Sequence, residues 1–131
     1  MYFIVIGAEP EGQRFLEIAL ENNHEVTLIE GNEEKARQLL KEHKVRVLNG
    51  DIADEDILEE AEVDRADAVI ATTYDDSKNL MAMALAKEHE VKTRISLINQ
   101  RSHLKLFEKL CTQVVSEPAA IIARQLYQYL S

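Results

Sequence analysis

The chain has 131 residues, with 15 Lys or Arg against 24 Asp or Glu, so its formal net charge is −9 at pH 7. This acidity argues against a nucleic-acid partner. No apolar stretch approaches the roughly 20 residues that span a bilayer, so we expect no direct membrane insertion. The single cysteine, Cys111, cannot form an internal disulfide, which favours a cytoplasmic location. With 46% hydrophobic residues, the length predicts one domain over residues 1–131.

The first half of the chain predicts strands and helices in alternation. Tyr2–Ile6 is a continuous apolar run, and the turn that follows it leads into a helix that ends at Asn22 and Asn23. A second strand, Glu25–Ile29, runs up to Glu30. Asn32 is expected to cap the next helix, and a third strand, Val45–Asn49, follows that helix.

The second half repeats this alternation. The expected elements are a helix around Glu55–Ala61, a strand at Ala68–Thr72, a helix from about Asp76 to Glu88, a strand at Thr93–Ile98, a helix near Ser102–Leu110, a strand at Gln113–Val115 and a final helix. Asp75, Asp76 and Ser77 are predicted to form the cap and first turn of the helix that runs to Glu88. Ser116 is expected to cap the final helix, with Pro118 in its first turn.

Together these elements predict an α/β fold of the Rossmann-like, doubly wound kind. The strands read as near-continuous apolar runs, and helices rather than two-residue turns connect them. That pattern indicates about six parallel strands with helices on both faces of the sheet.

The turn after the first strand resembles the dinucleotide-binding fingerprint G-x-G-x-x-G. Gly7, Glu9 and Gly12 occupy its three key positions, so two of the three glycines are present. The second glycine normally allows backbone to approach a pyrophosphate, whereas Glu9 adds a side chain and a negative charge there. Pro10 also removes one backbone N–H donor. The turn therefore fits either a modified phosphate site or a purely structural connection.

Glu30 is the residue that points most directly to a ligand. It lies 23 residues after Gly7, at the end of the second strand, where an acid about 20 residues on hydrogen-bonds a ribose hydroxyl. An acid at this position disfavours a ribose 2′-phosphate, so NADP is not expected. A solvated loop residue is the alternative interpretation.

Four segments carry a resemblance to a known family. They are YFIVIGAEPEG, HEVTLIEGNEEKARQL, VRVLNGDIADEDILEEAEVDRADAVIATTYDDSKNLMAMALAKE and INQRSHLKLFEKLCTQVVSEPAAIIARQL. In these segments the sequence resembles the regulator-of-potassium-conductance family, the RCK or KTN domains that form the N-terminal lobe of Trk- and Ktr-type potassium-transport regulators. The resemblance runs almost end to end and implies a regulatory domain that binds nucleotides.

The resemblance also implies a set of cofactor-binding residues. It assigns the phosphate turn to Gly7, Ala8, Glu9 and Gly12, and the ribose acid to Glu30. It assigns the adenine-side edge of the pocket to Asp51 and Ile52, and the switch-point side to Thr72, Thr73 and Asn79. Glu9 stands in place of a glycine, while Pro10 and Leu97 stand where the family has arginines. Calcium-gated members use carboxylates where this chain has Leu97 and Asn99, so we expect no metal.

Catalytic signatures are absent from the sequence. It has no G-x-S-x-G elbow, no P-loop lysine and no H-E-x-x-H motif, so we expect no enzyme. The acidic stretch over residues 54–62 fits a solvated face better than a metal site.

Two hypotheses follow for the function. In the first, an adenine nucleotide (AMP, ADP or ATP) or NAD(H) rearranges a homodimer or higher homo-oligomer, which acts on a membrane potassium transporter or channel subunit. Such a domain would be cytoplasmic, at the inner face of the membrane through that partner. The second is a degenerate Rossmann scaffold or dimerisation subunit that has lost dinucleotide binding.

The last helix bears on both hypotheses. Apolar residues recur at three- and four-residue spacing from Ala119 to Leu130, which predicts an apolar face that packs on the core or on a partner chain. In the resembled family this helix crosses between subunits and leads to a ligand-binding C-terminal lobe, which we expect to be absent from this chain.

Overall fold

The computed structural model describes residues 1–130, and it contains one six-stranded parallel sheet in the order β3-β2-β1-β4-β5-β6. The strands are β1 (Tyr2–Ile6), β2 (Glu25–Glu30), β3 (Arg46–Asn49), β4 (Ala68–Ala71), β5 (Thr93–Ile98) and β6 (Gln113–Ser116). This order is that of the Rossmann fold. The predicted doubly wound α/β class is therefore confirmed.

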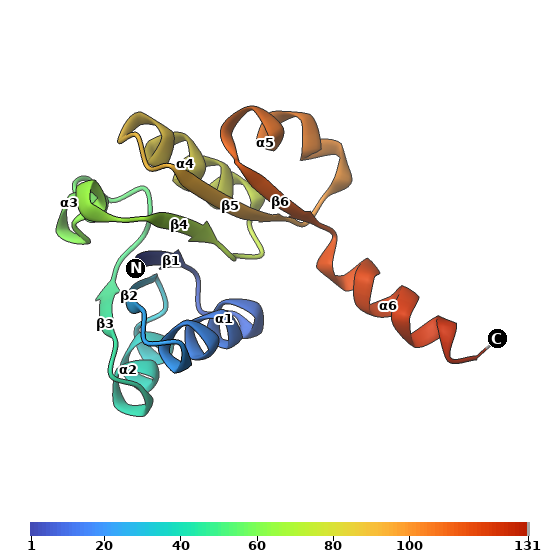
Figure 1. Cartoon of the computed structure of the whole chain (residues 1–131), viewed down its shortest axis with the longest axis horizontal. Helices are drawn as coiled ribbons and strands as arrows, with labels where there is room; N and C mark the ends of the chain where they lie inside the picture. The colour runs from blue at the N-terminus through green and yellow to red at the C-terminus, as the bar shows by residue number, and fades with distance from the viewer. Residues whose placement is uncertain (131) are drawn as a thin grey trace.

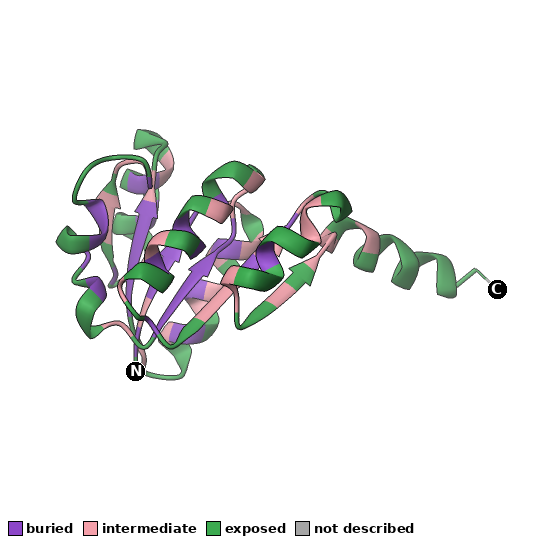
Figure 2. Cartoon of the chain, turned by 90° about the horizontal axis from the view of Figure 1, so that it is seen from above, coloured by how far each residue is buried: buried purple, intermediate pink, exposed green. Residues whose placement is uncertain are grey.

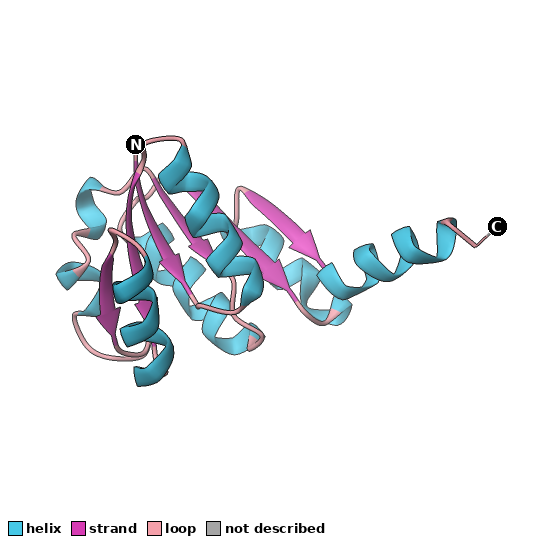
Figure 3. Cartoon of the chain, turned by 90° about the horizontal axis from the view of Figure 1, so that it is seen from below, coloured by secondary structure: helices cyan, strands magenta, loops and turns pink. Residues whose placement is uncertain are grey.

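Helices cover both faces of the sheet (Figures 1 and 3). They are α1 (Pro10–Glu21), α2 (Glu33–Glu42), α3 (Ile57–Glu60), α4 (Asp76–Glu88), α5 (Leu104–Leu110) and α6 (Pro118–Gln128), with single 3₁₀ turns at Val63–Arg65 and Arg101–His103. Helices α1 and α2 lie on one face, and α3, α4 and α5 lie on the other. Helix α6 covers neither face and projects away from the sheet (Figure 1).

Strand β1 supplies side chains to a separate core on each face. Ile4 and Ile6 are buried among residues of the α3–α5 side, whereas Val5 is buried with Leu16 of α1 and Leu28 of β2. Successive side chains of a strand point to opposite faces, so an unbroken apolar strand is needed where both faces are covered. The buried residues accordingly concentrate on the central strands (Figure 2).

The turn between β1 and α1 has almost no free space. Gly7 adopts φ +103°, a conformation that side chains disfavour. A Cβ at Gly12 would lie 2.2 Å from the Gly7 carbonyl oxygen and 2.4 Å from Oγ1 of Thr72. Both glycines are thus required by the close approach of α1 to β1 and β4, independently of any ligand.

One detail of the predicted helices was wrong. The short helix expected around Glu55–Ala61 is present as the single turn Ile57–Glu60; it begins late because Asp56 before it is left-handed (φ 66°) and Asp51 and Asp54 form side-chain turns with nearby backbone N–H groups. Ser116 does not cap α6. It is the last residue of β6, its hydroxyl is buried without a partner within residues 1–130, and left-handed Glu117 separates it from the helix.

The other boundaries agree with the prediction to within about two residues. Asn32 accepts a hydrogen bond from the backbone N–H of Lys35, and Asp75 accepts from those of Ser77 and Lys78, so both predicted caps are confirmed. No helix within residues 1–130 combines the length and the apolar character needed to cross a bilayer.

The packing of the first turn gives a stability prediction. We expect Gly12→Ala to lower the free energy of unfolding by about 2–3 kcal/mol, because the added methyl group forces the turn away from Thr72. Gly31→Ala is the control, since the nearest atom to its new Cβ is 3.7 Å away. Urea denaturation of both variants measures the difference, and equal stabilities would contradict this account of the turn.

Candidate functional site

A cleft of about 700 Å³ opens at the carboxyl ends of the central strands. It lies where α1 leaves β1 toward one face and α4 leaves β4 toward the other, the crevice in which doubly wound sheets bind ligands. Its lining comes from the ends of β1, β2 and β3, the loops after β1 to β4, and the first turns of α2 and α4: Ile6, Gly7, Glu9, Ile29, Glu30, Gly31, Asn32, Lys35, Asn49, Gly50, Asp51, Ile52, Asp54, Thr73, Tyr74, Asp75 and Lys78.

The structure brings six of the ten predicted site residues together in the lining of this cleft. These are Gly7, Glu9, Glu30, Asp51, Ile52 and Thr73. The remaining four, Ala8, Gly12, Thr72 and Asn79, lie beneath the lining or in the packing around it. Contact of any of the ten with a ligand stays a prediction.

Thr72 and Asn79 hold the wall of the cleft in place. The Thr72 hydroxyl lies 2.9 Å from the carbonyl oxygen of Ile6 and 3.0 Å from that of Gly7. Asn79 is fully buried; its Oδ1 accepts from the backbone N–H of Thr73, and its Nδ2 donates to the carbonyl oxygens of Thr73 and Leu97. These hydrogen bonds fix the loop after β4 against β1 and β5.

Glu30 is the cleft residue that points most directly to a ligand. It ends β2 and lines the cleft, and its Oε2 is buried without a hydrogen-bond partner within residues 1–130. A buried carboxylate oxygen without a donor is costly, so such atoms are rare in native proteins. A hydroxyl group at this point of the cleft would supply the donor, as the ribose of a nucleotide does at this position of the fold.

Two lysines that sequence reasoning missed also line the cleft. Nζ of Lys35, in the first turn of α2, lies 2.8 Å from Oε1 of Glu9. Nζ of Lys78, in the first turn of α4, lies 3.0 Å from Oδ2 of Asp51. Each lysine lies in the first turn of a helix that begins at the carboxyl edge of the sheet. This position is the signal by which both lysines could have been predicted to line the cleft. The charge of Glu9 is thus offset by a neighbour from another element.

The two ion pairs shift the pKa values of both lysines and of Asp51. A hydrogen bond to Glu9 raises the pKa of Lys35, and one to Asp51 raises that of Lys78. Hydrogen bonds from the backbone N–H of Ala53 and then from Lys78 lower the pKa of Asp51. Both lysines therefore stay charged at neutral pH. Within residues 1–130, no group of three or more His, Cys, Asp or Glu is arranged to hold a metal ion.

Asp76 ties the loop after β4 to the loop after β5. Its carboxylate accepts hydrogen bonds from the backbone N–H of Asn99 at 2.8 Å and of Gln100 at 3.0 Å, and it lies 2.7 Å from Nδ1 of His103. Burial by itself would raise the pKa of Asp76, but these hydrogen bonds lower it overall. The residue thus has a structural role beyond the helix start predicted for it.

The strand order, the glycine turn and the acid at the end of β2 define a domain of the Rossmann fold class. Residues 3–118 match the TrkA-N domain, so the chain belongs to the TrkA-N domain family. A Trk system potassium uptake protein TrkA homolog from Pyrococcus abyssi is 32% identical over 136 residues, covering 99% of this chain and 60% of that protein. The chain thus spans about three fifths of that relative's length, and 29% of a homolog from Archaeoglobus fulgidus.

Solved structures agree on the fold. The TrkA-N domain of the inner membrane protein ybaL from Escherichia coli superposes with a TM-score of 0.86 at 21% identity, covering 99% of this chain and 96% of that one. GsuK bound to ADP gives 0.82 at 24% identity, over 99% and 34% of the chains. The GsuK channel bound to NAD gives 0.77 at 20% identity, over 87% and 21%. The AMP-bound Kef CTD of Shewanella denitrificans gives 0.79 at 17% identity, over 100% and 82%.

The buried Asp76 carboxylate gives a pH-dependent prediction. We expect Asp76→Asn to lower the free energy of unfolding at pH 7 by about 1–3 kcal/mol, because the new amide leaves backbone donors unpaired. The folded-state pKa is lowered, so this stabilisation is present above the unfolded value of about 3.9 and is lost as pH falls through the folded value.

Denaturation curves at several pH values test this expectation. The gap between the native chain and Asp76→Asn should be full at pH 7 and should narrow below pH about 4. Asp64→Asn is a matched control, because Asp64 is an exposed acid that also pairs with a histidine, His89 at 3.2 Å. A gap that does not depend on pH would rule out the ionised carboxylate as its cause.

Proposed function

We propose that this chain is the nucleotide-binding regulatory domain of a potassium uptake or channel system. The observation that carries the proposal is the unpartnered Oε2 of Glu30 in the cleft, within a chain that belongs to the TrkA-N domain family. Its role is ligand binding rather than catalysis. The partner is a membrane potassium transporter or channel subunit, and the domain works at the cytoplasmic face of the membrane.

The ligand we propose is an adenine nucleotide or NAD(H). Proteins with this fold have been solved with ADP, NAD and AMP bound, which supports the ligand class. In our proposal Glu30 accepts from the ribose, and the loop from Asn49 to Ile52 forms the adenine side of the cleft. Gly7 and Glu9 border the phosphate side. Ligand binding would act on the partner by favouring one arrangement of the assembly over another.

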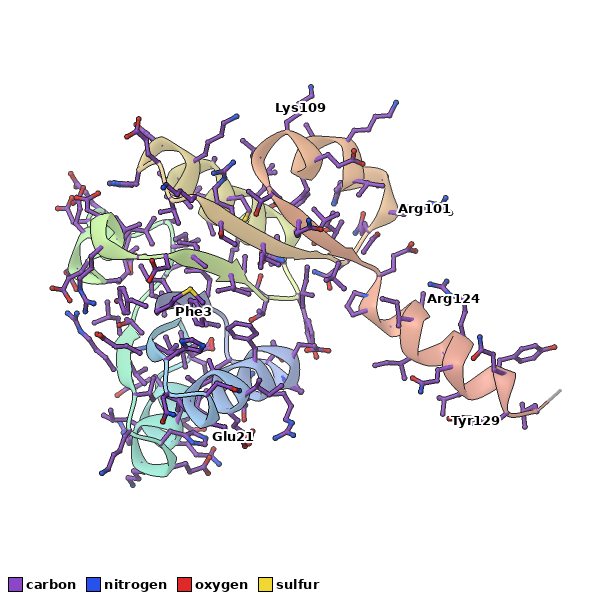
Figure 4. The ribbon with its side chains drawn as sticks, viewed as in Figure 1. Phe3, Glu21, Arg101, Lys109, Arg124 and Tyr129 are labelled. Carbon is purple, nitrogen blue, oxygen red and sulfur yellow. The ribbon has the colours of Figure 1, made fainter. Side chains whose placement is uncertain are left out.

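Helix α6 supports self-association as part of this function. None of its side chains is buried, and Ile121, Ile122 and Leu126 are among the exposed apolar residues of the chain. Figure 4 shows Arg124 of α6 and Tyr129, the residue just after the helix, extending away from the rest of the domain. An isolated helix of 11 residues is marginal in water, since helices shorter than about 12–15 residues need tertiary contacts. We therefore propose that α6 packs on a second copy of the chain.

Nucleotide binding is tested by thermal unfolding with AMP, ADP, ATP, NAD⁺ and NADH. We expect at least one adenine nucleotide to raise the midpoint by several degrees, because one-site binding at about 100 times Kd adds roughly 2.7 kcal/mol. Glu30→Ala should weaken that nucleotide at least about tenfold, since the ribose loses a charge-assisted hydrogen bond.

The control for Glu30 is Glu34→Ala, which removes an equal charge from an exposed position in the first turn of α2. It should leave the shift unchanged. If none of the five compounds shifts the native chain, the nucleotide-binding function is wrong and the scaffold hypothesis is favoured.

The role of α6 is tested by light scattering during size-exclusion chromatography. We expect the native chain to be a dimer or larger and the double variant Ile122→Glu, Leu126→Glu to be a monomer whose circular dichroism falls by no more than the contribution of α6, because these side chains contact no core. Arg124→Glu changes the net charge by the same amount on the opposite side of the helix and should remain associated. A native chain that is monomeric would contradict the proposal.

A further inference from the structure

The charge of the cleft poses a problem for a ligand that carries phosphate. Five carboxylates line it, from Glu9, Glu30, Asp51, Asp54 and Asp75, against only two cationic side chains, Lys35 and Lys78. Both lysines are already paired with carboxylates. A phosphate is repelled by such a lining unless a lysine exchanges its partner.

The Glu9–Lys35 ion pair is arranged so that Lys35 can exchange Glu9 for another anionic partner. Glu9 is the residue before the first turn of α1, yet its side chain caps no backbone N–H of that helix. Its carboxylate is instead directed at Nζ of Lys35, 2.8 Å away, and within residues 1–130 it has no other hydrogen-bond partner. Both side chains are partly exposed, and ion pairs of this kind are weak in water. Breaking this ion pair therefore costs the Glu9 side chain no other hydrogen bond.

The Asp51–Lys78 pair lacks this freedom. Asp51 also accepts a hydrogen bond from the backbone N–H of Ala53 at 2.9 Å, and its own N–H donates to the carboxylate of Asp54 at 2.8 Å. The carboxylate of Asp51 is thereby part of the turn after β3. Of the two acids, Glu9 is the one that can move away from its lysine without losing a hydrogen bond from the backbone.

Lys35 lines the cleft together with the residues that border the proposed ribose and phosphate positions. Its Nζ lies 2.8 Å from Oε1 of Glu9, and the hydrogen bond to Glu9 and the charge of Glu30 both raise the pKa of Lys35. Glu30 is the ribose acceptor of the proposed function, and Glu9 borders the turn into α1. A 5′-phosphate is joined directly to the ribose and falls between these two positions.

We propose that Lys35 is the phosphate-binding residue of this cleft and that Glu9 is its built-in competitor. The 5′-phosphate of an adenine nucleotide displaces the Glu9 carboxylate and becomes the partner of Lys35. The unliganded chain thus holds an internal anion in place of the phosphate, and the ligand class is a nucleoside 5′-phosphate rather than a free nucleoside. This inference rests on the proposed nucleotide-binding function and assigns its charge recognition to an exchange of ion pairs.

The test is a double-mutant cycle read by isothermal titration calorimetry with AMP and adenosine. We expect the native chain to bind AMP more tightly than adenosine. Lys35→Met should weaken AMP about ten- to a hundredfold, the effect of losing a charged hydrogen bond, and should leave adenosine unchanged. Glu9→Gln should strengthen AMP about three- to tenfold by removing the competitor. In the Lys35→Met background, Glu9→Gln should give a smaller gain, because no ion pair remains to be broken and only the repulsion of the phosphate is relieved.

The matched control is the Glu33–Arg37 pair, which joins the same two charge types on the exposed side of α2 at 2.8 Å. Glu33→Gln and Arg37→Met should change neither ligand's affinity. Circular dichroism of every variant checks that α2 and the sheet remain folded.

Three outcomes would overturn the inference. If Glu9→Gln strengthens AMP equally with Lys35 removed, Glu9 acts by repulsion alone and no exchange takes place. If Lys35→Met leaves the ratio of AMP to adenosine affinity unchanged, the phosphate lies elsewhere, and the nucleotide-binding function stands. If neither the native chain nor Glu9→Gln binds AMP or adenosine, while the Glu30 test is also negative, the proposed function fails with it.

Discussion

The close approach of α1 to β1 and β4 is the constraint on which the rest of this structure depends. At Gly12 there is no room for a single methyl group between the helix, the Gly7 carbonyl oxygen and Thr72. Thr72 joins β4 to the end of β1 by hydrogen bonds, so the two central strands and the first helix form one rigid unit. The crevice opens directly beside this unit, because the chain leaves β1 and β4 toward opposite faces of the sheet.

Beside this unit, some polar side chains of the cleft have structural roles, and others are free to bind a ligand. Around the cleft, Asn79 and Asp76 have their hydrogen-bonding capacity used by neighbouring loops, which fixes the walls. Glu30, by contrast, has a buried carboxylate oxygen without a hydrogen-bond partner within residues 1–130. Within the same residues, the side chains of Glu9 and Lys35 are hydrogen-bonded only to each other. Because buried polar groups in folded proteins are nearly always paired, the unpaired Oε2 of Glu30 marks a place where a ligand can bind, and the partly exposed Glu9–Lys35 pair lies in the same cleft.

Much of the fold and part of the site could be predicted from the sequence. Local signals, such as the apolar run Tyr2–Ile6 or the cap at Asn32, depend on neighbouring residues and were interpreted correctly. The spacing of Gly7 and Glu30 is set by one βαβ unit, and both residues line the cleft. Ser116 was assigned wrongly because its pairing with Ile98, distant in sequence, keeps it in a strand. Lys35 was missed because its partner, Glu9, lies 26 residues earlier in the chain.

The sequence by itself therefore determined the alternation of strands and helices, the parallel sheet with both faces covered, and an acid at the end of the second strand. These features follow from periodicity, caps and short spacings, which act within a few residues or one βαβ unit. Only the tertiary structure decided which polar side chains became structural and which stayed available. That choice depends on contacts between residues far apart in the chain. These contacts bury Asn79 and pair Glu9 with Lys35, and they leave α6 outside the core.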